Sequence, residues 1–367
     1  MGRRPVGFAL QHRVRGYLAV GFLFLLQNSI AQTQPASSLG TGSNPAPQIA
    51  PAPSAAPANS APTSPNPAPP DNATPAPAPS GGQAPEQDNG VFVFHKEVEE
   101  VMLHATVVDD QRHLIPNLDK SAFEVFEDGK PQPITSFHRD DVPVAMGIVI
   151  DNSGSMREKR DKVNEAVLNL IRQDNSSDEV FVVNFSREPY LDQDFTGDIN
   201  LVRTSLDKIS MQGSTALYDA IVASAVHLHN NPRIENRVLL VVTDGRDNAS
   251  RETLQEARLR LQQQNGPTLY AIGLMGDDLQ PQDRQVLDDL AASTGGAAFF
   301  PGSLDELNGI SRAIGHDIHS RYTIGYKSSN AARNGKYRTI QVQARAPGYA
   351  GLVVRTRKGY YPGEVVR

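Results

Sequence analysis

The sequence predicts an α/β protein: a doubly wound, mostly parallel sheet with helices on both faces, flanked by a small β-sandwich-like subdomain from N- and C-terminal strands. Three observations predict this fold class. Apolar strands alternate with amphipathic helices between residues 141 and 319, an order that favours a parallel sheet. The continuous apolar run at 238–242 is typical of a central strand buried on both faces. Strand-like segments with turn residues precede and follow this region.

Residues 1–31 have the pattern of an export signal. Four arginines precede the apolar stretch 17–26, and a region of small residues ends at Ala31. The apolar stretch is shorter than the roughly 20 residues that a membrane-spanning helix needs. We therefore expect an exported protein, in the periplasm or cell envelope or secreted. A membrane tether through an uncleaved signal segment stays the alternative.

Residues 32–89 have the composition of a disordered linker. They hold more than half of the chain's 27 prolines, interleaved with Ala, Ser, Asn and Gly, and almost none of the large apolar residues that a core requires. We predict an extended, polyproline-like tether. The chain contains no Cys, so disulfides cannot stabilise the folded part.

Residues 90–140 are predicted to form a small β subdomain that is too short to bury a core alone. A tight turn is expected at Asp128–Pro131. The C-terminal segment 320–367 is the expected packing partner of this subdomain. The predicted strands are 91–94, 101–108, 123–126 and 133–137, followed near the C-terminus by 321–326, 337–343 and 352–355.

The middle region, residues 141–319, supplies the parallel sheet and its helices. In the first predicted helix, apolar side chains at 163, 166, 167 and 170 recur at helical spacing. The predicted strands are 146–150, 178–185, 237–242, 268–274 and 298–300. The predicted helices are 157–172, 201–209, 216–226, 251–264, 283–292 and 304–318.

Three loops of this region carry small oxygen donors. Asp151, Ser153 and Ser155 follow one strand, Asp244 follows the central strand, and Thr215 precedes a helix. The carboxyl ends of parallel strands meet at one edge of a sheet, where such folds bind ligands. Two carboxylates and three hydroxyls, completed by water, suit Mg²⁺ or Mn²⁺ and suit zinc poorly. Such a bound cation would keep enough positive character to accept a carboxylate from a partner.

These three clusters resemble the metal-ion-dependent adhesion site of von Willebrand factor type A domains. The resemblance implies that Ser153, Ser155 and Thr215 contact the metal directly. It also implies that Asp151 and Asp244 hold the metal directly or through water, and that an acidic residue of a protein partner completes the shell. The flanking segments 123–130 and 322–326 resemble the bacterial VWFA-related exported proteins found largely in acidobacteria.

Other assignments are weaker. Asp219 and Asp247 lie near the clusters in sequence, but metal contact is not the favoured interpretation for either. We expect Asp219 to cap its helix or to be solvated, and we expect Asp247 to lie in a turn. The pairs His227/His229 and His316/His319 are interpreted as solvated helix positions. No phosphate-binding glycine loop, H-E-x-x-H or G-x-S-x-G motif occurs. The formal net charge of -6 argues against nucleic acid.

The sequence thus favours an exported, divalent-metal-dependent protein-binding or adhesion module without enzymatic activity. One alternative is an exported metal-dependent hydrolase, which would need a general base beside the metal that the sequence does not identify. The other is a structural envelope protein in which the metal only stabilises the fold.

Overall fold

The structure is a computed structural model that describes residues 100–363, except 140, 173–175, 209–212, 232, 275–278 and 331–333. The predicted signal, the linker and the strand predicted at 91–94 lie outside the described residues. All described residues belong to one compact unit, 89–367. None of the helices in this part of the chain has the length and hydropathy of a membrane span.

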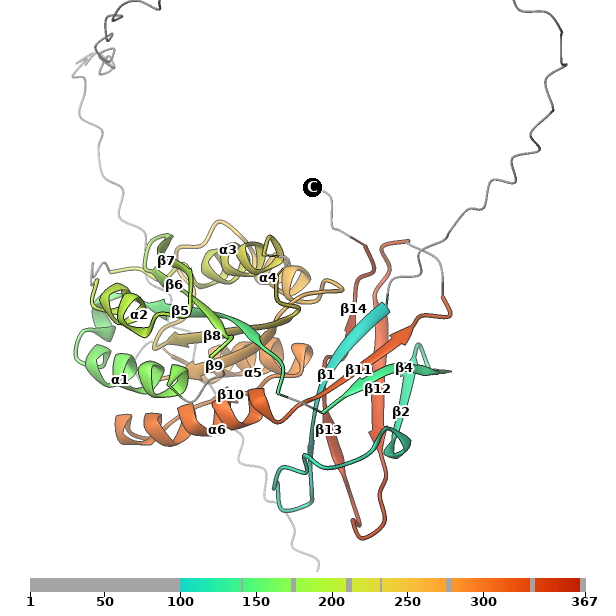
Figure 1. The fold of residues 1–367 in the computed structure, drawn as a ribbon. Helices are drawn as coiled ribbons and strands as arrows, with labels where there is room; N and C mark the ends of the chain where they lie inside the picture. Colours follow the sequence, from blue (N-terminus) through green and yellow to red (C-terminus); the bar gives the residue numbers. More distant parts are fainter. Residues whose placement is uncertain are drawn as a thin grey trace, which may run out of the picture. The chain divides into compact units, whose positions relative to one another are not determined.

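The core of this unit is a six-stranded sheet with the order β10-β9-β8-β5-β6-β7 (Figure 1). All neighbours pair in parallel except β7, which is antiparallel to β6 at the edge. This arrangement confirms the predicted fold class. The strands are β5 (Val144–Asp151), β6 (Glu179–Phe185), β7 (Pro189–Thr196), β8 (Asn236–Thr243), β9 (Thr268–Gly273) and β10 (Ala298–Phe299).

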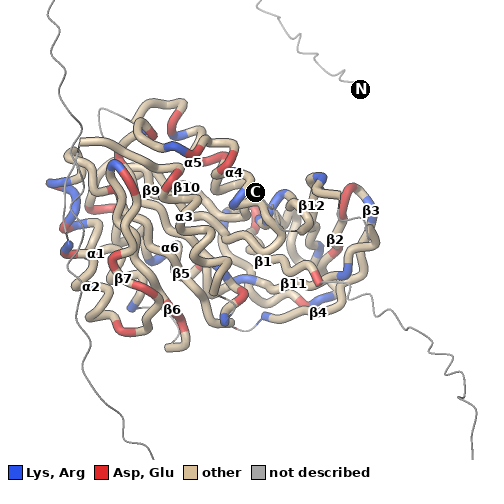
Figure 2. The backbone as a smooth tube through the Cα atoms, turned by 90° about the horizontal axis from the view of Figure 1, so that it is seen from above, with Lys and Arg blue, Asp and Glu red and all other residues tan. Residues whose placement is uncertain are grey.

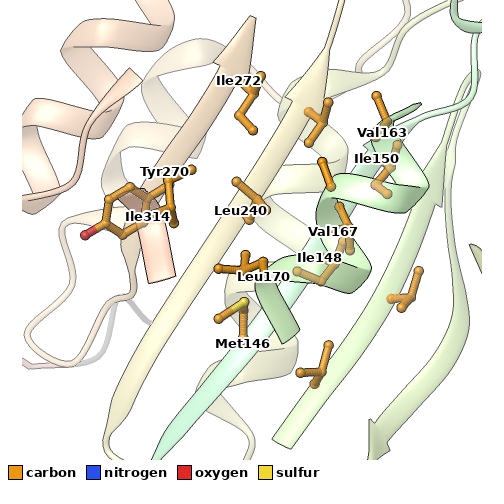
Figure 3. Packing of buried hydrophobic residues seen from close by; sticks show 14 of the residues in the cluster. Met146, Ile148, Ile150, Val163, Val167, Leu170, Leu240, Tyr270, Ile272 and Ile314 are labelled. Carbon is orange, nitrogen blue, oxygen red and sulfur yellow. The ribbon is translucent and has the colours of Figure 1, made fainter. Parts of the chain in front are cut away.

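Helices cover both faces of the sheet because successive residues of a buried strand point to opposite sides. Met146, Ile148 and Ile150 of β5 pack with α1, α2 and α6 (Figure 3), whereas Ala145 and Val149 pack with α3, α4 and α5. Every residue of β5 is therefore buried. The helices are α1 (Arg160–Ile171), α2 (Ile199–Leu206), α3 (Leu217–His229), α4 (Leu254–Leu261), α5 (Pro281–Thr294) and α6 (Leu307–His319).

Several element boundaries differ from the sequence prediction. The helix predicted from 157 begins at Arg160, because residues 154–156 form a 3-10 turn at the end of β5. The helix predicted from 251 begins at 254, where Thr253 and Glu256 form a capping box. Asp198 accepts a hydrogen bond from the Asn200 backbone N–H and starts α2 two residues earlier than predicted. A 3-10 turn at 304–306 precedes α6.

The remaining strands form two antiparallel four-stranded sheets, ordered β13-β1-β11-β4 and β14-β12-β2-β3. Both sheets combine strands from before and after the central sheet, since β1 pairs with β11 and β2 pairs with β12. Buried residues of the two sheets share one hydrophobic cluster. The strands are β1 (Glu100–Val108), β2 (Phe123–Glu127), β3 (Lys130–Gln132), β4 (Ile134–His138), β11 (Tyr322–Lys327), β12 (Arg338–Ala344), β13 (Val353–Arg355) and β14 (Gly359–Tyr360).

Buried polar contacts join the β-sandwich to the central sheet. Asp317 of α6 accepts hydrogen bonds from the Thr106 hydroxyl at 2.9 Å and from the Tyr270 hydroxyl, and it pairs with Arg355. The Arg357 guanidinium donates to the carbonyl of the last residue of α4 and to backbone carbonyls of the segment 263–266 that follows it. Each contact satisfies a group whose burial without a partner would be costly.

Candidate metal centre

Asp151 is fully buried at the carboxyl end of β5, and both of its carboxylate oxygens accept hydrogen bonds. Its Oδ1 accepts a hydrogen bond from the Ser153 backbone N–H at 2.8 Å, and its Oδ2 accepts one from the Thr243 hydroxyl at 2.6 Å. Burial raises the pKa of this carboxyl to about 6, although these hydrogen bonds oppose the shift. The strand β8 that supplies Thr243 is the direct neighbour of β5.

A chain of hydrogen bonds connects the Asp151 loop to Asp244. The Ser153 and Ser155 hydroxyl oxygens lie 3.1 Å apart, and the Ser155 hydroxyl donates to Asp244 Oδ1 at 2.8 Å. Asp244 is fully buried, and its Oδ2 accepts a hydrogen bond from the Lys159 ammonium at 2.5 Å. Two of the three predicted clusters therefore touch each other directly.

Thr215 joins the third loop to this group. It is buried just before α3, and its backbone N–H and carbonyl bond the side chain and backbone of Asn248 at 2.8 and 2.9 Å. A Cβ atom at Gly245 would lie 3.5 Å from the Thr215 hydroxyl oxygen, so this hydroxyl lies against the residue that follows Asp244. The structure thus brings together all five residues that the sequence singled out.

The donor chemistry of this cluster fits a hard divalent cation. It offers two carboxylates and three hydroxyls, with Ser155 exposed and Asp151, Ser153, Thr215 and Asp244 buried. Oxygen donors of this kind are the ligands that Mg²⁺ and Mn²⁺ prefer. Across the described ranges, no group of three or more His, Cys, Asp or Glu side chains is arranged to hold a metal. A candidate metal centre in this part of the chain therefore depends on hydroxyl ligands.

Three residues of the centre were missed by sequence reasoning. Thr243 fixes Asp151, Lys159 contacts Asp244, and Asn248 fixes Thr215. Thr243 stood beside Asp244 in the sequence, and Lys159 follows Ser155 by four residues, which places it about one helical turn further on. Neither spacing identifies a hydrogen-bond partner without the fold. For Asn248 the sequence held no signal beyond its closeness to Asp244.

Asp219 and Asp247 tie loops together. Asp219 Oδ1 accepts hydrogen bonds from the backbone N–H groups of Arg251 and Glu252 at 2.9 and 2.8 Å. Asp247 Oδ1 accepts bonds from the Tyr218 N–H at 3.3 Å and from the Ser250 hydroxyl. Both carboxylates thus connect the start of α3 to the loop that precedes α4.

The interpretation as a solvated helix position is wrong for His319 and only partly right for His227, whose side chain is 30% exposed. His227 Nε2 lies 2.8 Å from Asp194, and its ring stacks on Phe195 with a centroid distance of 5.0 Å. The His319 side chain is 14% exposed, and its Nδ1 lies 2.7 Å from Asp141. Both helices pack against other segments at these positions, which helical periodicity alone did not reveal.

The family model of the von Willebrand factor type A domain matches residues 146–246. No curated protein matches the sequence significantly. Among solved structures, a von Willebrand factor type A protein from Catenulispora acidiphila is 15% identical, with a TM-score of 0.42, covering 74% of this chain and 76% of that one.

Two other solved structures match a smaller part. The PilB minor pilin of Streptococcus sanguinis is 14% identical, with a TM-score of 0.42 over 52% of this chain and 64% of the pilin. Proximal thread matrix protein 1 of the mussel byssus, with zinc in its metal-ion-dependent adhesion site, is 17% identical and has a TM-score of 0.44. The match covers 52% of this chain and 49% of the byssus protein. The chain thus spans less than two thirds of the length of either structure.

Proposed function

The chain contains a von Willebrand factor type A domain, and we propose that this domain makes it a divalent-cation-dependent protein-binding module. The observation that carries the proposal is the convergence of Asp151, Ser153, Ser155, Thr215 and Asp244 at the carboxyl edge of the sheet. Domains of this family typically serve in adhesion or interaction. The proposal assigns the chain no enzymatic activity.

The hydrogen bonds of the centre explain how it would favour an incoming carboxylate. Lys159 already offsets part of the Asp244 charge, and Thr243 and the Ser153 N–H take up both Asp151 oxygens. A divalent cation held by these groups is therefore only weakly neutralised, and it attracts an acidic side chain more strongly than a fully neutralised ion does. Ser155 is the exposed member and marks the side from which a partner reaches the centre.

The oxygen donors favour Mg²⁺ or Mn²⁺ as the cation. Zinc sites in proteins use mainly Cys and His ligands, and none of the five candidate residues is of either type. The proposal further takes the protein to be exported to the periplasm, the cell envelope or the exterior. Export is inferred from residues 1–31, which have the pattern of a signal, and residues 32–89 would serve as a tether that lets the domain reach a partner.

The test compares wild type with Asp151→Ala in affinity capture from an envelope extract, with Mg²⁺ or with EDTA. Asp288→Ala, at an exposed aspartate of α5, is the matched control. We expect a specific partner to be retained by wild type and by the control in Mg²⁺, and to be lost with EDTA or with Asp151→Ala. If the same proteins are retained equally under all conditions, the proposal is wrong.

The same protein variants distinguish a binding module from the alternative in which the cation only stabilises the fold. If the cation only stabilises the fold, Mg²⁺ raises the melting temperature of wild type and of Asp288→Ala, while no partner is retained in a cation-dependent way. A binding module gives both effects, because a ligand that binds the folded state also stabilises it.

A further inference from the structure

We propose that a groove beside the metal centre binds a second acidic side chain of the same partner, so that the domain selects segments with two carboxylates. This inference rests on the proposed function of the centre. The groove, which we call the Arg187 groove, has a volume of about 850 Å³. It is lined by Arg187, Glu188, Tyr190, Gly213, Ser214, Ala249 and Arg251.

The walls of the Arg187 groove are joined to the candidate ligand Thr215. Ser214 is its neighbour in sequence, and the next residue, Ala216, donates its N–H to the carbonyl of Ser186 at 2.6 Å. The Asn248 N–H donates to the Thr215 carbonyl at 2.9 Å and fixes the loop that contains Ala249 and Arg251. The Arg187 groove therefore borders the loop that carries Thr215, and this is the side on which a peptide with one carboxylate at the centre would enter the groove.

Two cationic side chains of the groove are available to a ligand. Arg187 and Arg251 are exposed, and neither guanidinium forms a hydrogen bond or ion pair with the described part of the chain. Glu188, in contrast, already accepts a hydrogen bond from the Tyr190 hydroxyl at 2.7 Å. The groove thus offers two arginines against one engaged carboxylate. The planar, forked guanidinium pairs with a carboxylate through two parallel hydrogen bonds.

An exposed aromatic side chain lines the groove with these arginines, and an exposed aliphatic side chain follows it in sequence. Tyr190 and Leu191 at the start of β7 are 46% and 50% exposed. Tyrosine and arginine are enriched at protein interfaces and dominate their binding energy. Figure 2 shows acidic and basic residues interspersed over the elements of the central sheet, so the attraction of the groove for an acid is local. The occupant that fits is an acidic peptide segment of a protein partner.

The test selects ligands without knowledge of the natural partner. A random peptide library is displayed to the full chain in Mg²⁺, and bound peptides are eluted with EDTA. The affinity of the tightest peptide is then measured for wild type, for Arg187→Gln with Arg251→Gln, and for the control Arg345→Gln. Arg345 is an exposed arginine just after β12, in the β-sandwich.

We expect the selected peptides to carry two acidic residues. The double arginine variant should bind them about tenfold more weakly than wild type, as expected for two exposed ion pairs, and the control should bind them unchanged. Replacing one particular acidic residue of the peptide by its amide should cause the same loss. In the double arginine variant, the same replacement in the peptide should cause little further loss of affinity, because the change in the protein and the change in the peptide remove the same interaction.

The outcomes separate this inference from the proposed function. One outcome overturns the second contact and leaves the metal centre in place. In it, the selected peptides depend on Mg²⁺ but carry a single essential acid, and they bind the double arginine variant as tightly as wild type. Failure to recover any EDTA-eluted peptide with wild type overturns both. Both arginines are exposed, so the variant should melt at the wild-type temperature.

Discussion

At the scale of single residues, Lys159 competes with a metal ion for Asp244. Its ammonium group contacts Asp244 Oδ2, and the Lys159 side chain is 19% exposed. A cation that binds Asp244 must weaken this contact. Lys159→Met should therefore tighten Mg²⁺ binding about fivefold, the equivalent of a partly exposed ion pair of about 1 kcal/mol. Isothermal titration calorimetry of the metal checks the change.

The matched control for this prediction is Lys162→Met on α1. Lys162 is exposed and pairs with Asp305 at 3.6 Å, away from Asp244. The substitution Lys162→Met removes the same charge three residues further along the chain and should leave the Mg²⁺ affinity near the wild-type value. Equal effects of the two substitutions would mean that only net charge matters, and weaker binding by Lys159→Met would contradict the competition.

At the scale of elements, the position of β5 between β6 and β8 requires a small residue at its centre. Gly147 lies opposite Phe181 on one side and Leu239 on the other, and a Cβ there would come within 2.4 Å of Phe181 Cζ and 2.6 Å of Leu239 Cδ2. Gly147→Ala should therefore lower the free energy of unfolding by about 1–3 kcal/mol through overpacking. Denaturant unfolding measures this loss.

Gly309 of α6 provides the comparison. It is exposed, and a Cβ there would meet no atom within 4 Å. Gly309→Ala should raise the free energy of unfolding by up to about 1 kcal/mol, because alanine is the better helix former. If Gly147→Ala is as stable as wild type, the close packing of β5 against its two neighbours is wrong.

The elements also show what the sequence could and could not predict. The strands β5 and β8 were predicted because both lie under helices on two faces, which requires continuous apolar runs. The edge strand β7 was missed: its sequence mixes Asp and Gln with apolar residues, and its residues are half-buried or exposed. The short strands β3 and β14 gave no periodicity that a pattern could detect.

The candidate centre was predictable in part for a related reason. Asp151 and Asp244 follow strands whose apolar runs fix their common edge, so their proximity could be expected from the fold class. The contacts of Lys159 and Asn248 depend on how a helix and a loop are placed over that edge. Such contacts between elements are set by tertiary packing, and local sequence patterns do not contain them.

At the scale of the whole molecule, His104 makes the stability of the fold dependent on pH. It lies on β1, with its Nδ1 3.3 Å from the Thr323 hydroxyl, and it lines a cavity with Glu100, Glu235 and Arg237. Burial, and then the charges of Arg321 and Arg357, lower its pKa from 6.5 to about 3. His104 is therefore neutral in the folded protein at a pH where the unfolded chain is protonated.

The sign of the effect follows from proton binding. Between about pH 6.5 and pH 3 the unfolded state binds a proton at His104 that the folded state does not, so the contribution of His104 to stability is full above pH 6.5 and is lost as the pH falls. The slope should be up to about 1.4 kcal/mol per pH unit. His104→Gln should flatten the curve of unfolding free energy between pH 6.5 and 5, whereas His138→Gln, at an exposed position of β4, should not. Parallel curves for wild type and His104→Gln would contradict a neutral His104.

Anomalous scattering from crystals of the chain soaked in Mn²⁺ shows whether the three loops form one cation site. We predict one manganese peak among the hydroxyls of Ser153, Ser155 and Thr215, at the roughly 2.1 Å typical of oxygen ligands to such small cations, with Asp151 and Asp244 bound directly or through water. The same soak of Asp151→Ala crystals should lose the peak. A manganese peak elsewhere, or none at this edge of the sheet in wild-type crystals, would contradict the account.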